Sequence, residues 1–174
     1  ERQYSGAGMG VLYRPHDRSW GVGLDINRVQ RRDHDGHFGT FDYTVNTGHL
    51  TWYQDLPWYG LHGEVSVGKY LAGDVGVTYK LERQFDSGFK VGGFFTLTDV
   101  PFDVYGEGKF DKGFYIEVPF DLLTPTPMKG RFTQMIRPLT RDGGQKLNIR
   151  NRLWDITEPG RDVNHNQHWD RILE

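Results

Sequence analysis

Apolar and polar residues alternate along most of this chain of 174 residues. In the segment 20–27, Trp20, Val22, Leu24 and Ile26 alternate with glycine, aspartate and asparagine. A period of two residues with one apolar side is typical of a β-strand whose two faces meet different surroundings. The chain is therefore predicted to be all-β, and its length favours a single domain.

Turn-forming residues separate the alternating segments and predict an antiparallel meander of about nine strands. The expected strands cover residues 5–14, 20–32, 41–54, 61–70, 75–84, 89–99, 112–122, 131–138 and 146–156. No segment shows a convincing helical period with a capping residue before it.

Composition excludes several classes of protein. The chain has no apolar run near the about 20 residues that a membrane-spanning helix needs. Its formal net charge of -2 provides no basic field for nucleic acid, and the absence of cysteine excludes disulfides and thiolate metal sites. Because the sequence starts at Glu1 without a methionine or a signal segment, we expect a processed protein or a fragment.

Parity assigns an apolar and a polar face to each strand. Residues expected on the apolar face include Met9, Val11, Val45, His49, Val67 and Leu147. Residues expected on the polar face include Asn46, Glu64, Ser66, Lys80, Lys90, Trp52, Phe94 and Tyr115. A division of this kind over most strands predicts a sheet with one greasy and one charged surface.

Parity leaves open which face lies outside. In a soluble barrel such as a lipocalin the apolar face surrounds a ligand, whereas in an outer-membrane barrel it meets lipid and the polar face lines a lumen. Aromatic residues near strand ends, among them Tyr13, Trp20, Tyr53 and Tyr70, favour the membrane, as do glycine on the polar face and strands of about 9–11 residues. We expect residues 1–158 to form part or all of a transmembrane β-barrel and the polar residues 159–174 a tail. A soluble ligand-binding barrel is the alternative.

Several motifs resemble a known family. The most specific are GKYLAGDVGVTYKLERQFDSGFKVGGFFTLTDV at 68–100, GEGKFDKGFYIEVPFDLL at 106–123 and RPLTRDGG at 137–144, and VLYRP at 11–15 and WGVGLDINRVQRRD at 20–33 also agree. In this order they resemble the C-terminal part of the YjbH and GfcD family of outer-membrane β-barrel proteins, which are usually lipoproteins. Members are much longer, and the lipidated cysteine is absent here, so the resemblance implies a C-terminal portion of such a protein.

The resemblance also implies a function. Because family members are encoded with exopolysaccharide or capsule genes, we expect a bacterial outer-membrane protein that acts in polymer export or assembly as a conduit or scaffold, not as an enzyme. Its expected partners are polysaccharide, outer-membrane lipid, periplasmic proteins of the exopolysaccharide system and the remaining N-terminal part of the protein. No cofactor or metal is expected.

Three polar-face carboxylates carry the alternative that the barrel is an enzyme acting on the polymer or on lipid. Glu64, Glu82 and Glu117 would supply an acid and a base, which sugar hydrolysis requires at a separation of about 5–10 Å. A charged lumen without chemistry accounts for the same residues more simply.

Other polar groups suggest chemistry only weakly. His49, His62 and Ser66 are nucleophile candidates without a surrounding elbow motif. The loop 33–37 offers aspartate and histidine ligands without the spacing of a calcium loop, and His165 and His168 would need metal ligands from elsewhere. Each group is more simply interpreted as a solvated or space-filling side chain.

Basic residues gather in the last part of the chain. They are Arg131, Arg137, Lys146, Arg150 and Arg152. If the sheet closes, they predict a basic wall that guides an anionic polysaccharide, with Trp52 and Tyr115 stacking on sugar rings. Pairing of these cations across the lumen with Glu117, Asp121 or residues of the missing strands is the alternative interpretation.

Overall fold

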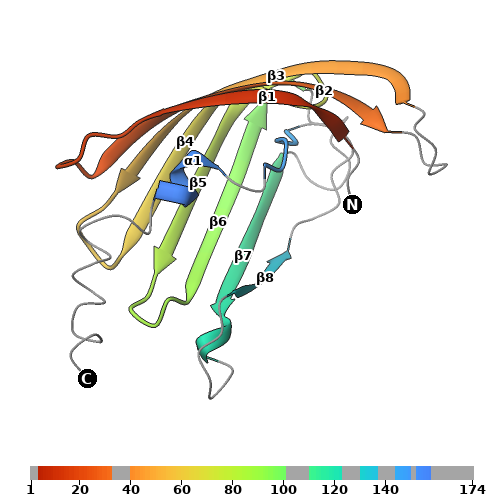
Figure 1. Cartoon of the computed structure of the whole chain (residues 1–174). Helices are drawn as coiled ribbons and strands as arrows, with labels where there is room; N and C mark the ends of the chain where they lie inside the picture. Colours follow the sequence, from red (N-terminus) through yellow and green to blue (C-terminus); the bar gives the residue numbers. More distant parts are fainter. Residues whose placement is uncertain are drawn as a thin grey trace.

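The computed structural model describes residues 4–32, 40–100, 110–122, 130–136, 144–149 and 152–157. They form an eight-stranded antiparallel sheet in which each strand pairs with its neighbours in sequence (Figure 1). The strands are β1 (Tyr4–Tyr13), β2 (Trp20–Arg32), β3 (Thr40–Asp55), β4 (Leu61–Lys69), β5 (Val75–Gln84), β6 (Lys90–Thr98), β7 (Asp111–Pro119) and β8 (Arg131–Ile136). The predicted meander and the first eight strands are confirmed.

The ninth predicted strand, at 146–156, is wrong. Residues 145–149 are irregular, and a short helix, α1 (Leu153–Thr157), follows. The backbone here bonds to the β4–β5 turn: Gly144 N donates to Asp74 Oδ2 at 2.8 Å, and Leu71 N donates to the Gln145 carbonyl at 3.0 Å. These bonds draw the segment away from the sheet edge, where a strand would pair.

The expectation of no helix is also wrong, since α1 and the single turn η1 (Phe120–Leu122) are present. No helix in the described part of the chain has the length and hydropathy needed to cross a membrane. The predicted tail, 159–174, lies outside the described residues, so the predicted division of the chain at 158 stays a prediction.

The outer face of the sheet is apolar and exposed. Strand register places Val11, Leu24, Leu50, Val67, Val77 and Leu97 in one row across six adjacent strands. Side chains on this face stay open to the surroundings, with Met9 68%, Leu50 54% and Phe114 50% exposed. The predicted alternation is therefore confirmed on most strands, and the apolar face is the uncovered one.

The opposite, inner face is polar and buried. Thr51, Ser66 and Thr96 are at most 2% exposed, and even Glu64 is only 7% exposed. Residues 144–149 and 152–157, called the strap from here on, cross this face, and α1 lies inside the bend of the sheet (Figure 1). A sheet with one wet face ordinarily buries its apolar side, so this sheet is inverted with respect to a water-soluble one.

β3 has the opposite parity to the one predicted. Val45 lies on the inner face, where it forms a small apolar cluster with Val29 and Leu71. Asn46 lies on the outer face, opposite Arg28. These rows lie beyond the end of the apolar band, so the outward residues are polar there and the inward ones are apolar. The predicted faces of Val45, Asn46, His49 and Trp52 are therefore wrong.

Aromatic pairs lie at several strand ends. Trp20 stacks on Trp52 with ring centroids 5.0 Å apart, and Phe85 lies 5.5 Å from Phe89. Cations accompany such rings, as where the Arg83 guanidinium lies 4.5 Å from the Phe85 ring. Aromatic rings with nearby cations suit the headgroup region of a bilayer.

Two of the aromatic residues expected at the strand ends have a different position. Tyr53 and Tyr70 are 4% and 0% exposed. The Tyr70 hydroxyl lies 2.6 Å from Thr78 Oγ1, and the Tyr53 ring stacks on Trp154 of the strap. Both tyrosines therefore belong to the inner face.

β1 and β8 are the two edges of the sheet. Within the described residues they do not pair with each other, so the sheet is curled but not closed. β8 is also exposed along its whole length. Exposed strand edges carry unpaired backbone groups that favour pairing with a further strand.

Candidate functional site

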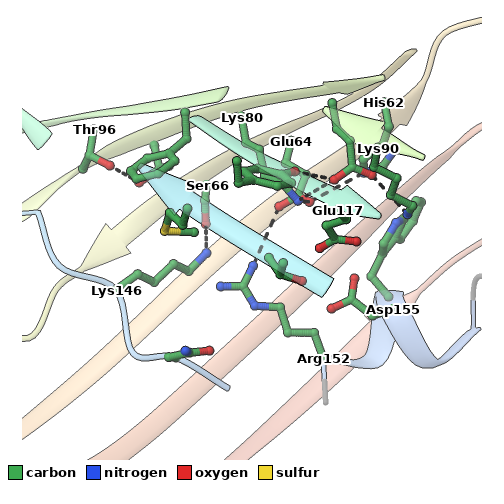
Figure 2. Close-up of a pocket in the computed structure, with 18 of the residues that line it drawn as sticks. His62, Glu64, Ser66, Lys80, Lys90, Thr96, Glu117, Lys146, Arg152 and Asp155 are labelled. Atoms are coloured by element: carbon green, nitrogen blue, oxygen red, sulfur yellow. Dashed lines mark hydrogen bonds and ion pairs between the residues drawn. The ribbon is translucent and has the colours of Figure 1, made fainter. Parts of the chain in front are cut away.

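A pocket of about 660 Å³ lies between the inner face of β4–β8 and the strap. Figure 2 shows charged side chains of the sheet and the strap converging on it. Alternation along the strands directs every second side chain into this space, as with Glu64 and Ser66 on β4 and Lys80 and Glu82 on β5. Its volume falls in the range of about 300–1,000 Å³ that is common for small-ligand pockets.

Lys80 is the centre of an ion network in the pocket. Its Nζ lies 2.6 Å from Glu64 Oε1 and 3.6 Å from Glu82 Oε2. Register explains the first contact, because Glu64 and Lys80 are directly paired across β4 and β5. His62 Nε2 and Arg152 NH1 approach Glu64 at 3.7 and 3.8 Å. Glu64 is therefore surrounded by positively charged and polar groups on a buried surface.

A glycine makes room for the second half of the network. Glu82, Gly92 and Tyr115 follow one another across β5, β6 and β7. A Cβ at Gly92 would lie 2.5 Å from Cζ of Tyr115, so only glycine lets the ring lie flat over β6. The Tyr115 hydroxyl then donates to Glu82, which also pairs with Lys90 at 3.2 Å. An aromatic ring lying over a glycine on the neighbouring strand is a known way to strengthen a sheet.

Trp154 anchors the strap at one end of the pocket. Its indole is 3% exposed and stacks on Tyr53 with centroids 4.3 Å apart and planes within 7°. The Arg14 guanidinium covers the ring at 3.8 Å. Beneath it lies Gly21, where a Cβ would be 2.8 Å from Trp154 Cζ3. Residues of β2, β3 and the turn between β1 and β2 thus surround one side chain of the strap.

Lys146 extends from the strap towards β4. Its Nζ donates to Ser66 Oγ at 2.6 Å, and Ser66 Oγ lies 2.7 Å from Thr51 Oγ1. No carboxylate of the described residues lies within 4 Å of this ammonium. Burial and the nearby Arg152 guanidinium lower the pKa of Lys146 to about 8.

The candidates named from the sequence fall into three groups. Glu64, Glu82, Glu117, Tyr115, Arg131, Lys146 and Arg152 all line the pocket. Arg137 and Arg150 lie outside the described residues. Trp52 was predicted to face the same space and does not, because it lies on the outer face against Trp20. Contact of the pocket residues with polysaccharide stays a prediction.

The predicted basic wall is only partly paired within the described residues. Arg131 NH1 lies 3.5 Å from Glu117 Oε2 at the exposed edge, and Arg152 approaches Glu64. Lys146 differs, since its bond is to a hydroxyl. Pairing within the chain therefore describes Arg131, whereas Lys146 remains a candidate for contact with an anionic polymer.

The nucleophile candidates do not form a catalytic arrangement in the described residues. His62 Nδ1 bonds to Asp55 Oδ1 at 2.7 Å, His49 packs edge-on against Tyr70, and the Ser66 hydroxyl bonds to Thr51 and Lys146. The loop 33–37, Asp121's side chain, His165 and His168 lie outside the described side chains.

Sequence reasoning missed the buried tryptophan of the strap. Trp154 was included in a predicted strand, and Tyr53 was expected at a membrane interface, yet the two rings stack under the strap. A signal existed in the glycines of β2, because Gly21 and Gly23 leave space where Trp154 and Tyr53 pack. Their partners are too far away in sequence to be inferred from it.

Comparison with known proteins agrees with the motif resemblance. Residues 1–159 match the model of the YjbH family, described as "Exopolysaccharide biosynthesis protein YbjH". The chain is 45% identical over 166 residues to the "Uncharacterized lipoprotein YjbH" of Escherichia coli (strain K12), an alignment that covers 90% of this chain and 23% of that relative. The chain thus spans about a quarter of the length of this relative. No solved structure matches it. The match over most of the chain and the identity to the Escherichia coli lipoprotein show that this chain belongs to the YjbH family of exopolysaccharide biosynthesis proteins.

Proposed function

We propose that the chain forms part of an outer-membrane β-barrel that serves exopolysaccharide or capsule export or assembly as a conduit or scaffold. The observation that carries the proposal is the inverted sheet, with an exposed apolar outer face and a buried, charged inner face. Lipid suits an apolar surface that spans all strands, because a water-soluble monomer rarely exposes a large contiguous apolar patch.

The inner face fits the role of a lumen. Its charged residues and hydroxyls border a pocket of about 660 Å³ instead of packing into a dry core. In membrane barrels the polar residues of each strand face the lumen, and they determine which molecules the lumen accepts. The exopolysaccharide description of the family suggests that the passing or assembled molecule is a polysaccharide, with periplasmic proteins of the same system as partners.

The open edges support a larger assembly. β1 and β8 are unpaired with each other in the described residues, and the chain spans 23% of the Escherichia coli relative. Further strands of the longer protein would satisfy both edges and complete the barrel.

A role as an enzyme has less support. Glu64 and Glu82 both contact Lys80, and Glu117 contacts Arg131. A cation beside each carboxylate disfavours the protonated form that the acid in sugar hydrolysis needs. A soluble ligand-binding barrel is also less favoured, since its apolar face would surround the ligand.

Val67→Lys tests the membrane assignment. Val67 lies in the middle of the apolar row, between Leu50 and Val77. A lysine on the lipid-facing surface of a barrel costs about 2–4 kcal/mol at the middle of the bilayer and less towards its surfaces. In cells that lack the full-length protein, we expect wild type to restore surface polysaccharide and Val67→Lys to yield little heat-modifiable protein in outer-membrane fractions and little polymer.

Asn46→Lys is the matched control, because Asn46 is exposed on the same face but beyond the apolar band. It should assemble and restore polymer as wild type does. If Val67→Lys behaves like Asn46→Lys, or folds without detergent, the membrane assignment is wrong. If the wild-type protein assembles in the outer membrane but does not restore surface polysaccharide, the export role is wrong.

A further inference from the structure

Two cations of the pocket lack the partners that buried cations usually have. Within the described residues, Lys146 bonds only to the Ser66 hydroxyl. Arg152 makes no hydrogen bond there, and its closest acidic contact is Glu64 Oε2 at 3.8 Å. Lys146 is partly buried, and the Arg152 side chain is 26% exposed. Removing cations from water without charge-assisted hydrogen bonds is unfavourable, so this arrangement favours an anion.

The nearby carboxylate is already shared. Glu64 Oε1 accepts a hydrogen bond from Lys80 Nζ at 2.6 Å, whereas Arg152 NH1 lies 3.8 Å from Glu64 Oε2. Because Lys80 already pairs with Glu64, neither Arg152 nor Lys146 has a carboxylate at hydrogen-bonding distance within the described residues. Figure 2 shows both side chains rising from the strap towards β4, beside Ser66 and Glu64. Their head groups therefore border the same part of the pocket.

We propose that Lys146 and Arg152 form a binding site for the carboxylate of an acidic sugar unit. This inference rests on the proposed role in polysaccharide export and names the substrate class as a uronate-containing chain. An arginine fork and an ammonium are the groups that hold carboxylates most strongly. The pocket of about 660 Å³ has room for a sugar unit beside them.

The surroundings of Lys146 give the site a pH dependence. The charged and titratable groups near it are Asp25 on β2, His49 on β3, Glu64 on β4, Lys80 on β5 and Arg152 on the strap. The lowered pKa of Lys146, about 8, means that it is mostly protonated at pH 7 and loses its proton near pH 8 to 9. A uronate stays ionised throughout this range, as carboxylic acids do above about pH 5. Its affinity should therefore fall as the pH rises from 7 to 9.

The test is titration calorimetry of the full chain, folded in detergent micelles, with trigalacturonate as the probe. Galactotriose is the neutral control and inorganic phosphate the simple anion. We expect trigalacturonate to bind about tenfold more tightly than either, because a charge-assisted contact to each cation adds to the sugar contacts. The pH series should show the fall described above.

Three variants distinguish a built site from general charge attraction. Lys146→Gln should weaken trigalacturonate binding about tenfold, whereas Lys146→Arg should retain most of it. Lys69→Gln, an exposed lysine at the end of β4 away from the pocket lining, should leave binding unchanged. Circular dichroism of each variant checks that the sheet is intact.

Several results would overturn the inference: equal binding of galactotriose, phosphate as strong as trigalacturonate, or Lys146→Gln equal to wild type. Failure of the proposed function is measured separately by the Val67→Lys experiment in cells. A chain that assembles and supports polymer export, yet binds trigalacturonate no better than galactotriose, keeps the function and overturns the acidic-sugar site.

Discussion

Replacing Lys80 by methionine is expected to destabilise the folded chain by about 3 kcal/mol, because it leaves the buried Glu64 carboxylate without its closest cation and removes one of the two cations beside Glu82. Lys80 Nζ is 2.6 Å from Glu64 and 3.6 Å from Glu82, and both glutamates are 7% exposed. The other contacts of Glu64 with basic side chains, from His62 at 3.7 Å and Arg152 at 3.8 Å, are too long to replace it. Urea unfolding in detergent micelles, followed by tryptophan fluorescence, measures the change.

The control for Lys80→Met is Arg131→Met. Arg131 also pairs with a glutamate, but its side chain is 52% exposed. Exposed ion pairs contribute about 0–1 kcal/mol, so little change is expected. The double variant Lys80→Met with Glu64→Gln should recover part of the loss, since it removes a stranded charge. Equal effects of Lys80→Met and Arg131→Met would show that the network does not stabilise the fold.

Trp154→Ala is expected to release the strap at a cost of about 3–5 kcal/mol, the usual range for deleting a buried aromatic side chain. Trp154 holds α1 to the sheet through Tyr53 and Arg14. Without it the strap loses its main apolar contact with the inner face. We expect proteases to cut within residues 144–157 far faster than in wild type, with cleavage mapped by mass spectrometry.

Two further variants sharpen this test. Ile156→Ala, on the same helix but 58% exposed, should leave both stability and cleavage unchanged. Gly21→Val should release the strap as Trp154→Ala does, although no residue of the strap is changed. The reason is that a Cβ at residue 21 would lie only 2.8 Å from the Trp154 indole. Slow cleavage in both Trp154→Ala and Gly21→Val would mean that other contacts hold the strap.

The strands could be predicted because their signal is local. Alternation marks a strand wherever neighbouring residues face opposite surroundings, and eight of the expected strands agree with the structure. β3 is the strand on which alternation fails to identify the faces. Its first half carries the apolar Val45 on the inner face, whereas its second half carries the apolar Trp52 on the outer face. Assigning the apolar face from the first half therefore gives the wrong face for the second half.

The pocket could be predicted only in part. Parity identified Glu64, Glu82 and Tyr115 as neighbours on one face, because strand register alone brings them together. The route of the strap could not be predicted. Residues 146–156 alternate as a strand does, yet the backbone bonds to the β4–β5 turn and the chain ends in α1 over the inner face.

By itself the sequence determined the family, the meander and the existence of two unlike faces, since motifs, turns and alternation are local properties. Only the tertiary structure decided that the apolar face is the uncovered one and that Lys146 and Arg152 face β4 from the strap. Those features depend on the seat of Trp154, which Arg14, Gly21, Tyr53 and His62 build together. Contacts between residues so far apart along the chain leave no local pattern, because each is set by how the whole sheet curves.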